Sequence, residues 1–331
     1  DHGPSYQPYP DYMLINNGGE SFTLYTMETR YNARRVTACD FDGDHDADIY
    51  VSNYRLLPNL LWRNDGGGTF TEVAAAYNAV ATSPGYGGGH SIGACWGDFD
   101  NDGLFDLFAG NFAHPGQPES RFLRNRGAAH GYTFEDMGTC GVYFQESYSS
   151  PAAADYDNDG RLDLFFTTVY EVASFGIPNY PVLFRNGGGF DFETAESEAL
   201  DKLPATYQAA WGDYNNDGRP DLVTAGRVFR NDGIGTNHWL KIRLRGDGDA
   251  VNRSAIGARV TLTAGTRTMV RQVEAGTGQG NQNAPALLFG LGQADDPVDI
   301  EIAWPDGTID TVTGVQPDQL ITREYSSSAE P

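Results

Sequence analysis

An acidic segment recurs four times along the 331-residue chain. It reads DFDGDHDADIYVSN from Asp40, DFDNDGLFDLFAGN from Asp98, DYDNDGRLDLFFTT from Asp155 and DYNNDGRPDLVTAG from Asp213. The copies begin about 58 residues apart, and such regular spacing indicates one supersecondary unit used several times. Any fold for this chain must therefore be built from a repeated module.

Two further motifs accompany each acidic segment. A run of small residues precedes it, as in IGACWGD or QAAWGD, and an Asn-Gly turn between apolar residues follows it, as in LLWRNDGGGTF or LFRNGGGFDF. A fifth such turn, LINNGGESFTLY, lies near the N-terminus with no acidic segment before it. The five turns begin at Asn16, Asn64, Asn125, Asn186 and Asn231.

Within each acidic segment, side-chain oxygens fall at positions 1, 3, 5 and 9. Position 6 is glycine in the last three segments, and glycine tolerates the positive φ of a sharp turn; His45 replaces it in the first. Alternating carboxylates around such a turn are typical of calcium loops. The predicted ligands of about four Ca²⁺ ions are Asp40, Asp42, Asp44, Asp48, Asp98, Asp100, Asp102, Asp106, Asp155, Asp157, Asp159, Asp163, Asp213, Asn215, Asp217 and Asp221.

The alternative is four polar surface turns without metal, since Asp-Asn-Gly turns are common. Three or four carboxylates at one spacing, repeated four times, need a counter-charge, and this favours the metal. The segments are not EF-hands, because position 12 is not glutamate and short β-rich runs follow each loop. Magnesium fits less well than calcium because it keeps its hydration water.

The overall charge limits the partners. Against 22 Lys and Arg stand 45 Asp and Glu, for a net charge of −23, which argues against nucleic acids and anionic membrane surfaces. The sequence contains no apolar run of about 18 residues, the length that a membrane-spanning helix needs. The chain starts at Asp1, from which we expect a mature secreted or cell-surface protein after removal of a signal peptide. Free calcium is abundant in that environment.

Helix signals are almost absent. The 41 Gly and 17 Pro break short apolar stretches, which predicts an all-β protein. A unit of about 58 residues has room for four short strands, one blade of a β-propeller. The small-residue run would form the inner strand, because blades crowd at the axis, and Trp96 and Trp211 would pack between blades.

WGDFDNDGLFDLFAGN and WGDYNNDGRPDLVTAG resemble the FG-GAP, or VCBS, repeats of integrin-like propellers. The resemblance covers about residues 14–235 and implies four to five blade units, in a complete or an incomplete ring, with a calcium loop between the first two strands. It implies that the four aspartate sets are the calcium ligands. His45 in place of glycine and Asn215 in place of aspartate depart from the family pattern.

Past Gly235 the chain alternates apolar and polar residues between turns, which predicts a β-sandwich. NHWL, NRSAIGARV, FGLG and WPDG resemble the ASPIC/UnbV domain, seen after FG-GAP repeats in the cartilage acidic protein family and in bacterial surface proteins. This implies a secreted or surface protein that contacts other macromolecules, with no enzymatic activity to transfer. The expected divisions are an extension (1–13), the propeller repeats (14–235), the ASPIC/UnbV sandwich (236–325) and a tail (326–331).

Three cysteines leave two alternatives. Either one disulfide forms, with Cys95–Cys140 as first choice, or all three are buried small residues. The cysteines are Cys39, Cys95 and Cys140.

Three functions remain open. The first is an extracellular calcium-binding interaction or structural protein (an adhesin, matrix component or surface-assembly subunit) whose partners are other surface proteins or copies of itself. The second is a lectin-like binder in which exposed aromatics such as Tyr86 or Tyr170 stack on glycans near a calcium ion. The third is a calcium-dependent enzyme on the propeller face. No catalytic residue is predicted, and His90, His114 and His130 are expected to be ordinary loop residues.

Five Asn-Gly hairpins stand against only four acidic loops. Either Ser21–Met27 closes the fourth unit as its outer strand, leaving the strand around Leu14–Asn16 over, or the propeller is open and its edges need covering. The sandwich could cover one edge and another subunit the other. We therefore expect the segment Asp1–Met27 at a contact within a larger assembly; the alternative is a closed, monomeric propeller.

Overall fold

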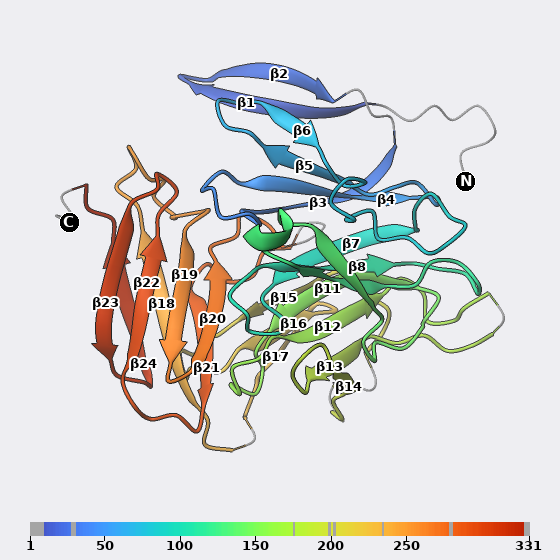
Figure 1. The fold of residues 1–331 in the computed structure, drawn as a ribbon. Helices are drawn as coiled ribbons and strands as arrows, with labels where there is room; N and C mark the ends of the chain where they lie inside the picture. The colour runs from blue at the N-terminus through green and yellow to red at the C-terminus, as the bar shows by residue number, and fades with distance from the viewer. Residues whose placement is uncertain are drawn as a thin grey trace.

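The computed structural model describes residues 10–27, 31–174, 176–197, 200, 203–233, 235–277 and 281–327. Over these residues the fold is all-β, with one 3-10 turn at Ala128–His130 (η1). Figure 1 shows a series of small sheets beside a sandwich of longer strands. No helix in the described ranges has the length and apolar character that a membrane crossing requires.

Each acidic repeat forms one antiparallel sheet whose strands lie in chain order. The first sheet contains β3 (Asn32–Cys39), β4 (Asp48–Tyr54), β5 (Leu60–Asn64) and β6 (Phe70–Glu72). The second contains β7 (Ser91–Gly97), β8 (Asp106–Asn111), β9 (Arg121–Asn125) and β10 (Phe134–Gly138). The third contains β11 (Tyr148–Ala154), β12 (Asp163–Thr168), β13 (Val182–Asn186) and β14 (Phe192–Thr194). The fourth has three strands, β15 (Ala209–Gly212), β16 (Asp221–Thr224) and β17 (Arg227–Phe229).

The first strands of successive sheets pack against one another in the order β3, β7, β11, β15. Small residues are needed there: a Cβ at Gly93 would lie 2.6 Å from Arg35 Nη1 and 3.0 Å from the Ser149 carbonyl oxygen. Trp96 and Trp211 are buried in clusters that combine residues of neighbouring sheets. The prediction of small inner strands with tryptophans packed between sheets is confirmed.

The N-terminal strands form a hairpin of their own. β1 (Asp11–Gly18) pairs with β2 (Ser21–Met27) in a two-stranded sheet, so the prediction that Ser21–Met27 completes the fourth unit is wrong. The reason is local: the short turn between them places Leu14 directly opposite Leu24, and Met27 packs with Trp62 of the first sheet. Neither strand is left over.

Residues 238–324 form two facing sheets with one core. One sheet has the order β21–β18–β24, with β18 and β24 parallel, and the other the order β20–β19–β22–β23. Between them lie buried apolar side chains including Phe289, Ile300 and Trp304. The strands are β18 (His238–Arg245), β19 (Arg259–Ala264), β20 (Arg267–Gln272), β21 (Leu287–Gly292), β22 (Val298–Ala303), β23 (Ile309–Val315) and β24 (Gln319–Glu324).

The C-terminal part also covers an edge of the repeat sheets. The backbone N–H of Trp211 on β15 donates to Asn283 Oδ1 (2.9 Å), and the Trp211 carbonyl accepts from Ala284 N–H (2.9 Å). Within the described residues, no strand pairing joins the fourth sheet to the first. The C-terminal part thus bonds to the free edge of β15, as expected for the case of an open propeller; whether the ring is open or closed stays a prediction.

Candidate calcium centres

Each acidic loop joins the first and second strands of its sheet, and its first aspartate organises the turn. In the second loop, Asp98 Oδ1 accepts a hydrogen bond from the backbone N–H of Asp102 (3.0 Å), and Asp98 Oδ2 accepts one from Gly103 (3.3 Å). Asp40, Asp155 and Asp213 make the same two bonds to positions 5 and 6 of their own loops. The first position therefore shapes all four loops alike.

The ninth aspartate anchors the loop to the rest of its sheet. Asp106 Oδ2 accepts from Phe99 N–H (3.1 Å), and its Oδ1 accepts from Asn125 N–H (2.8 Å). The same pair of bonds recurs at Asp48, Asp163 and Asp221. Because Asn125 begins the Asn-Gly turn, this contact physically connects the acidic motif with the turn motif that follows it in every repeat.

The asparagine of that turn also joins successive loops, a role that sequence reasoning missed. Asn125 Nδ2 donates to the Phe105 carbonyl of its own loop (3.2 Å) and to the Phe41 carbonyl of the preceding loop (2.9 Å). The equivalent bonds are made by Asn186 and Asn231. The recurrence of the Asn-Gly turn was visible in the sequence, but it indicated only a hairpin.

Three of the loops gather their carboxylates into triads. In each triad, ligand oxygens from positions 1, 3 and 9 all lie within 4.8 Å of one another, and the first and ninth residues are buried. The triads are Asp40–Asp42–Asp48, Asp98–Asp100–Asp106 and Asp155–Asp157–Asp163. Several close carboxylate oxygens are the donor set of a hard divalent cation. These three triads can hold a metal ion.

The protein's own cations neutralise the triads only in part. Arg124 Nε lies 2.7 Å from Asp100 Oδ2, and Arg185 Nε lies 2.8 Å from Asp157 Oδ2. Burial, with a smaller contribution from neighbouring aspartates, raises the pKa of Asp98 and of Asp155 to about 7 in spite of the nearby Arg271, and it raises the pKa of Asp48 to about 8. Asp42 Oδ1 is buried without a hydrogen-bond partner. Raised pKa values and an orphaned oxygen are what a carboxylate cluster shows when a positive charge is missing from its centre. The donor set therefore fits Ca²⁺.

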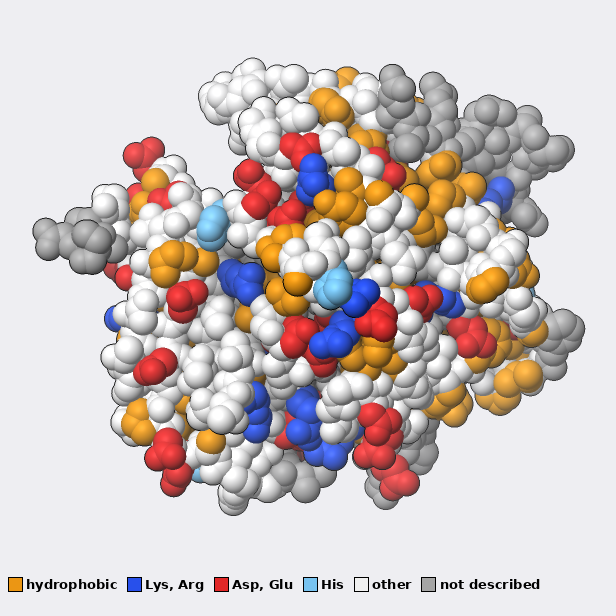
Figure 2. All heavy atoms as spheres, viewed as in Figure 1, with side chains coloured by type: hydrophobic (Ala, Val, Ile, Leu, Met, Phe, Trp, Pro, Cys, Tyr) orange, Lys and Arg blue, Asp and Glu red, His pale blue; other side chains and the backbone are white. Residues whose placement is uncertain are grey.

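The fifth-position aspartates lie outside these triads. Asp102 Oδ2 is 3.1 Å from Arg124 Nη2, and Asp159 Oδ2 is 3.1 Å from Arg185 Nη2. Figure 2 shows basic side chains beside acidic ones on the face viewed. Asp44 is exposed. Coordination by position 5 stays a prediction.

His45 keeps the turn of the first loop in spite of its Cβ. Its φ is 72°, in the left-handed region that Gly103 (88°) and Gly160 (90°) also occupy. A left-handed conformation costs a non-glycine residue roughly 1 kcal/mol. The departure from glycine therefore strains the loop without dispersing its triad.

The fourth loop differs from the other three. Lys241 Nζ donates to Asp213 Oδ2 (2.9 Å), and both side chains are buried. Asn215 is exposed, and its amide donates to Asp217 Oδ2 (2.8 Å). This loop thus has one carboxylate fewer than the others and an ammonium group beside its first position.

The sandwich rests on the loops. Val270 N–H donates to Asp98 Oδ2 (3.2 Å), and Gly290 N–H donates to Asp155 Oδ2 (3.1 Å). A Cβ at Gly290 would lie 2.1 Å from that same oxygen, which explains the glycine inside the FGLG motif. On the first loop, Gln272 Oε1 accepts from the backbone N–H of Asp40 (3.1 Å). The acidic loops therefore form the interface between repeats and sandwich.

The cysteines are all free thiols, so the predicted Cys95–Cys140 pair does not form. Cys95 lies on β7 and Cys140 follows β10, at opposite edges of one four-stranded sheet. Cys39 and Cys95 are buried, as the alternative interpretation expected, while Cys140 is partly exposed.

Tyr86, Tyr170 and His114 do not belong to the acidic loops. The third acidic loop precedes β12 and Tyr170 follows β12, so the two lie at opposite ends of this strand. Tyr170 is therefore not placed to stack on a sugar beside a calcium ion. The Tyr86 hydroxyl donates to the Gly116 carbonyl (3.0 Å). His114 Nδ1 lies 2.6 Å from Glu146 Oε1, a more specific contact than an ordinary loop histidine makes.

Two family descriptions match the chain. Residues 248–330 match "ASPIC and UnbV", and residues 53–109 and 170–224 match "FG-GAP-like repeat". The second match includes the Asp98 and Asp213 loops. The chain thus carries FG-GAP-like repeats followed by an ASPIC/UnbV domain, as the motifs predicted.

The chain is similar to cartilage acidic protein 1. It is 29% identical to the Mus musculus protein over 84% of this chain and 43% of that one, and 29% identical to the Homo sapiens protein over 79% and 39%. It spans about two fifths of the length of these relatives. A solved structure, the V. cholerae biofilm matrix protein Bap1, aligns with 87% of this chain and 40% of that one at 12% identity and a TM-score of 0.37, too weak a likeness to support an argument.

Proposed function

We propose that this chain is an extracellular calcium-binding structural protein that works as part of a matrix or surface assembly. The observation that carries the proposal is the position of three buried aspartate triads at the interface between the repeat sheets and the sandwich. Repeated sites of this kind suit the high free calcium outside cells. The similarity to proteins whose name refers to cartilage supports the same placement.

The aspartates would hold calcium and the second domain together. Bound calcium would supply the positive charge that lets the buried carboxylates remain ionised. Asp98 and Asp155 would bind the ion while one oxygen of each still accepts a backbone N–H from the sandwich. Metal binding and docking of the sandwich would therefore reinforce each other, and the protein would be rigid only where calcium is plentiful.

Fractionation and metal analysis test this function. In cultures of the native producer we expect the protein in the extracellular fraction. A wash with EDTA should release it from insoluble material, whereas a control wash with magnesium and no EDTA should leave it bound. Elemental analysis of the purified protein should find calcium at about three ions per chain, matching the three triads. Protein that is intracellular, or that contains no calcium after purification in calcium buffer, would refute the proposal.

A contact with other subunits at the N-terminal hairpin is supported by its outer face. Tyr12, Leu14, Phe22 and Leu24 are 56–62% exposed there, and exposed apolar patches mark interaction sites. Residues 1–9 of the predicted contact segment lie outside the described residues. If the hairpin mediates assembly, native material should be larger than a monomer by light scattering, and Leu14→Lys with Leu24→Glu should reduce its size. Val223→Lys, 47% exposed on β16, serves as the control; a monomeric native protein would refute the contact.

A further inference from the structure

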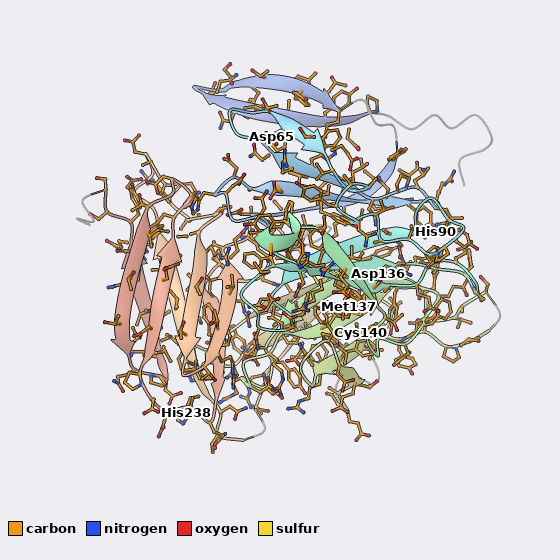
Figure 3. All side chains as sticks on the ribbon, viewed as in Figure 1. Asp65, His90, Asp136, Met137, Cys140 and His238 are labelled. Carbon is orange, nitrogen blue, oxygen red and sulfur yellow. The ribbon has the colours of Figure 1, made fainter. Side chains whose placement is uncertain are left out.

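A cavity of about 330 Å³ lies at the end of the repeat sheets opposite the acidic loops. Strands β4, β8 and β12 each begin at the ninth aspartate of a loop and end near Tyr54, Phe112 and Tyr170. At a rise of about 3.3 Å per residue, these aromatics lie roughly 20 Å from the triads. Figure 3 shows His90, which contacts Tyr54, on the side of the molecule away from the sandwich. The cavity is therefore separate from the calcium centres.

Three successive repeats contribute an aromatic ring to this cavity. Phe112 contacts both of the others, with ring centroids 6.2 Å from Tyr54 and 5.9 Å from Tyr170. Phe112 is buried, whereas Tyr170 is 57% exposed. The exposed ring of Tyr170, which packs against the buried ring of Phe112, presents an apolar surface to a ligand.

One wall of the cavity carries a carboxylate whose hydrogen bonds are already made within the protein. Glu146 Oε1 accepts from Ser174 Oγ (2.5 Å) and lies 2.6 Å from His114 Nδ1, while Oε2 accepts from Ser174 N–H (2.9 Å). Burial alone would raise the pKa of Glu146, but the hydrogen bonds from Ser174 and His114 lower it. The carboxylate of Glu146 thus holds His114 and Ser174 in position through these hydrogen bonds.

The two histidines have defined roles in their hydrogen bonds. His90 Nδ1 accepts from the backbone N–H of Arg55 (3.1 Å), so the proton of the neutral ring is on Nε2. Burial and the neighbouring His114 lower the pKa of His90 to about 4, which keeps the ring neutral. His114 uses Nδ1 on Glu146, and its Nε2 makes no hydrogen bond to the described residues. His90 thus presents a neutral imidazole beside the aromatic rings.

The charge balance decides the class of ligand. A cationic ligand would need an unpaired carboxylate, but Glu146 accepts three internal hydrogen bonds. The guanidinium of Arg34, which lies over the Tyr54 ring at 5.0 Å, carries a positive charge that offsets the carboxylate of Glu146, so neither sign of charge dominates the cavity. Apolar rings with a few neutral polar groups suit a molecule that has both C–H faces and hydroxyl groups.

We propose that this cavity, which we call the aromatic cup (Tyr54, Phe112, His114, Glu146, Tyr170 and Ser174), binds a neutral carbohydrate. One face of a sugar ring packs on Tyr170 and Phe112, and a hydroxyl reaches His114 Nε2. The volume of the cup lies within the range of small-ligand sites. The site would give the protein a contact with glycans that is independent of its calcium-dependent structure.

The test uses the full chain in calcium buffer on a microarray of neutral glycans, followed by calorimetry with the free oligosaccharide that binds best. Tyr170→Ala should weaken that binding at least about tenfold, or about 1.4 kcal/mol. Tyr214→Ala, which removes a similarly exposed tyrosine (60%) from the fourth acidic loop, should leave the affinity unchanged. Ser174→Ala should also weaken binding, because it frees Glu146 and His114 to move, with thermal unfolding recorded to show that the variant is folded.

Four results of the binding experiments would overturn the proposal. They are no binding to any neutral glycan at millimolar concentration, equal loss in Tyr214→Ala and Tyr170→Ala, an affinity that Tyr170→Ala leaves intact, and displacement of the glycan by tetramethylammonium. At a temperature below the unfolding midpoint of the calcium-free protein, adding EDTA should leave glycan binding intact. Strict calcium dependence in folded protein would place the sugar at the metal instead and refute the cup. A failure of calcium binding itself would be seen separately in the metal analysis.

Discussion

The first three acidic loops and the fourth share a backbone but differ in their centres. In all four, the first aspartate accepts the N–H groups of positions 5 and 6, and the ninth accepts the N–H of the turn asparagine. The first three place three carboxylates within 4.8 Å of one another. In the fourth, the buried Lys241 of the sandwich lies beside the first aspartate, Asp213. The arginines of the second and third loops are partly exposed and pair with the third-position aspartates instead.

A repeated acidic motif does not by itself determine whether a metal binds, because residues of the neighbouring domain also contribute charge to the loop. The fourth loop keeps the hydrogen bonds that define the turn, yet a neighbouring domain has placed a permanent cation beside it. An ammonium at 2.9 Å supplies positive charge where a metal would otherwise supply it. We therefore expect calcium in the first three loops and an internal ion pair in the fourth.

Removing calcium should give the largest difference between the two kinds of loop. A ligand present at 100 times its Kd stabilises the folded state by about 2.7 kcal/mol per site, so loss from three sites should lower the melting temperature strongly. Hydrogen exchange should show that EDTA deprotects the Asp40, Asp98 and Asp155 loops more than the Asp213 loop. Equal deprotection of all four would erase the distinction, and an unchanged melting temperature would remove the calcium sites altogether.

The pH dependence of the calcium-free protein comes next. Asp48, Asp98 and Asp155 hold pKa values of about 8, 7 and 7 in the fold, whereas an unfolded aspartate has a pKa of about 3.9. Between these limits the folded state binds more protons, so the free energy of unfolding should fall as pH rises from about 4 to 8. Denaturant titrations in EDTA at several pH values measure this. Protein loaded with calcium should lack the decline; a free energy of unfolding that rises with pH in EDTA would contradict the argument.

Replacing the lysine tests the fourth loop directly. Lys241→Met leaves Asp213 buried without its partner, and breaking a buried ion pair costs about 3–5 kcal/mol. In EDTA the variant should be destabilised by that amount, and combining it with Asn215→Asp should raise the calcium content from about three to about four ions per chain. Arg245→Met, which breaks an exposed pair with Glu324, should change stability by less than about 1 kcal/mol. A calcium content that stays at three in the double variant would contradict the role given to Lys241.

The turn asparagines should show a smaller effect that depends on their position in the series. Asn186 is buried and its Nδ2 bonds to its own loop and the preceding one, so Asn186→Ala should cost roughly 2 kcal/mol. Asn64 belongs to the repeat of the first acidic loop, which has no earlier loop to bond, and among the described residues its Nδ2 donates only one weak bond, to the Ala47 carbonyl at 3.4 Å. Asn64→Ala should therefore cost less in the same chemical denaturation experiment. Equal costs would show that the bond between loops adds nothing.

The smallest expected effect is a gain. His45→Gly removes the strain of a left-handed residue at position 6, which should stabilise the protein by roughly 1 kcal/mol. The change should leave the calcium affinity of the Asp40 loop within about threefold, because the triad is already assembled. A destabilised variant would show that the imidazole makes a contact worth more than the strain.

Much of the fold, and the aspartates of the candidate calcium loops, could be predicted from the sequence. The spacing of the acidic segments, the Asn-Gly turns and the small inner strands predicted repeated four-stranded sheets, and the C-terminal alternation predicted a sandwich. These features are local, since each depends on residues within one repeat. A hairpin at Asn16 was expected, but the sequence left open where its strands would pair and whether Cys95 and Cys140 would join, because a count of motifs does not say which edges meet.

By itself the sequence determined which oxygens each loop offers, because their order along a tight turn fixes their spacing. Only the tertiary structure decided what surrounds those oxygens. Lys241 is 28 residues from Asp213 and Gly290 is 135 from Asp155, and no local pattern records that they meet. The same holds for Tyr54, Phe112 and Tyr170, which three separate repeats bring to one cavity. Charge balance and cavity shape arise from contacts between distant segments, so they are decided by packing rather than by any single stretch of chain.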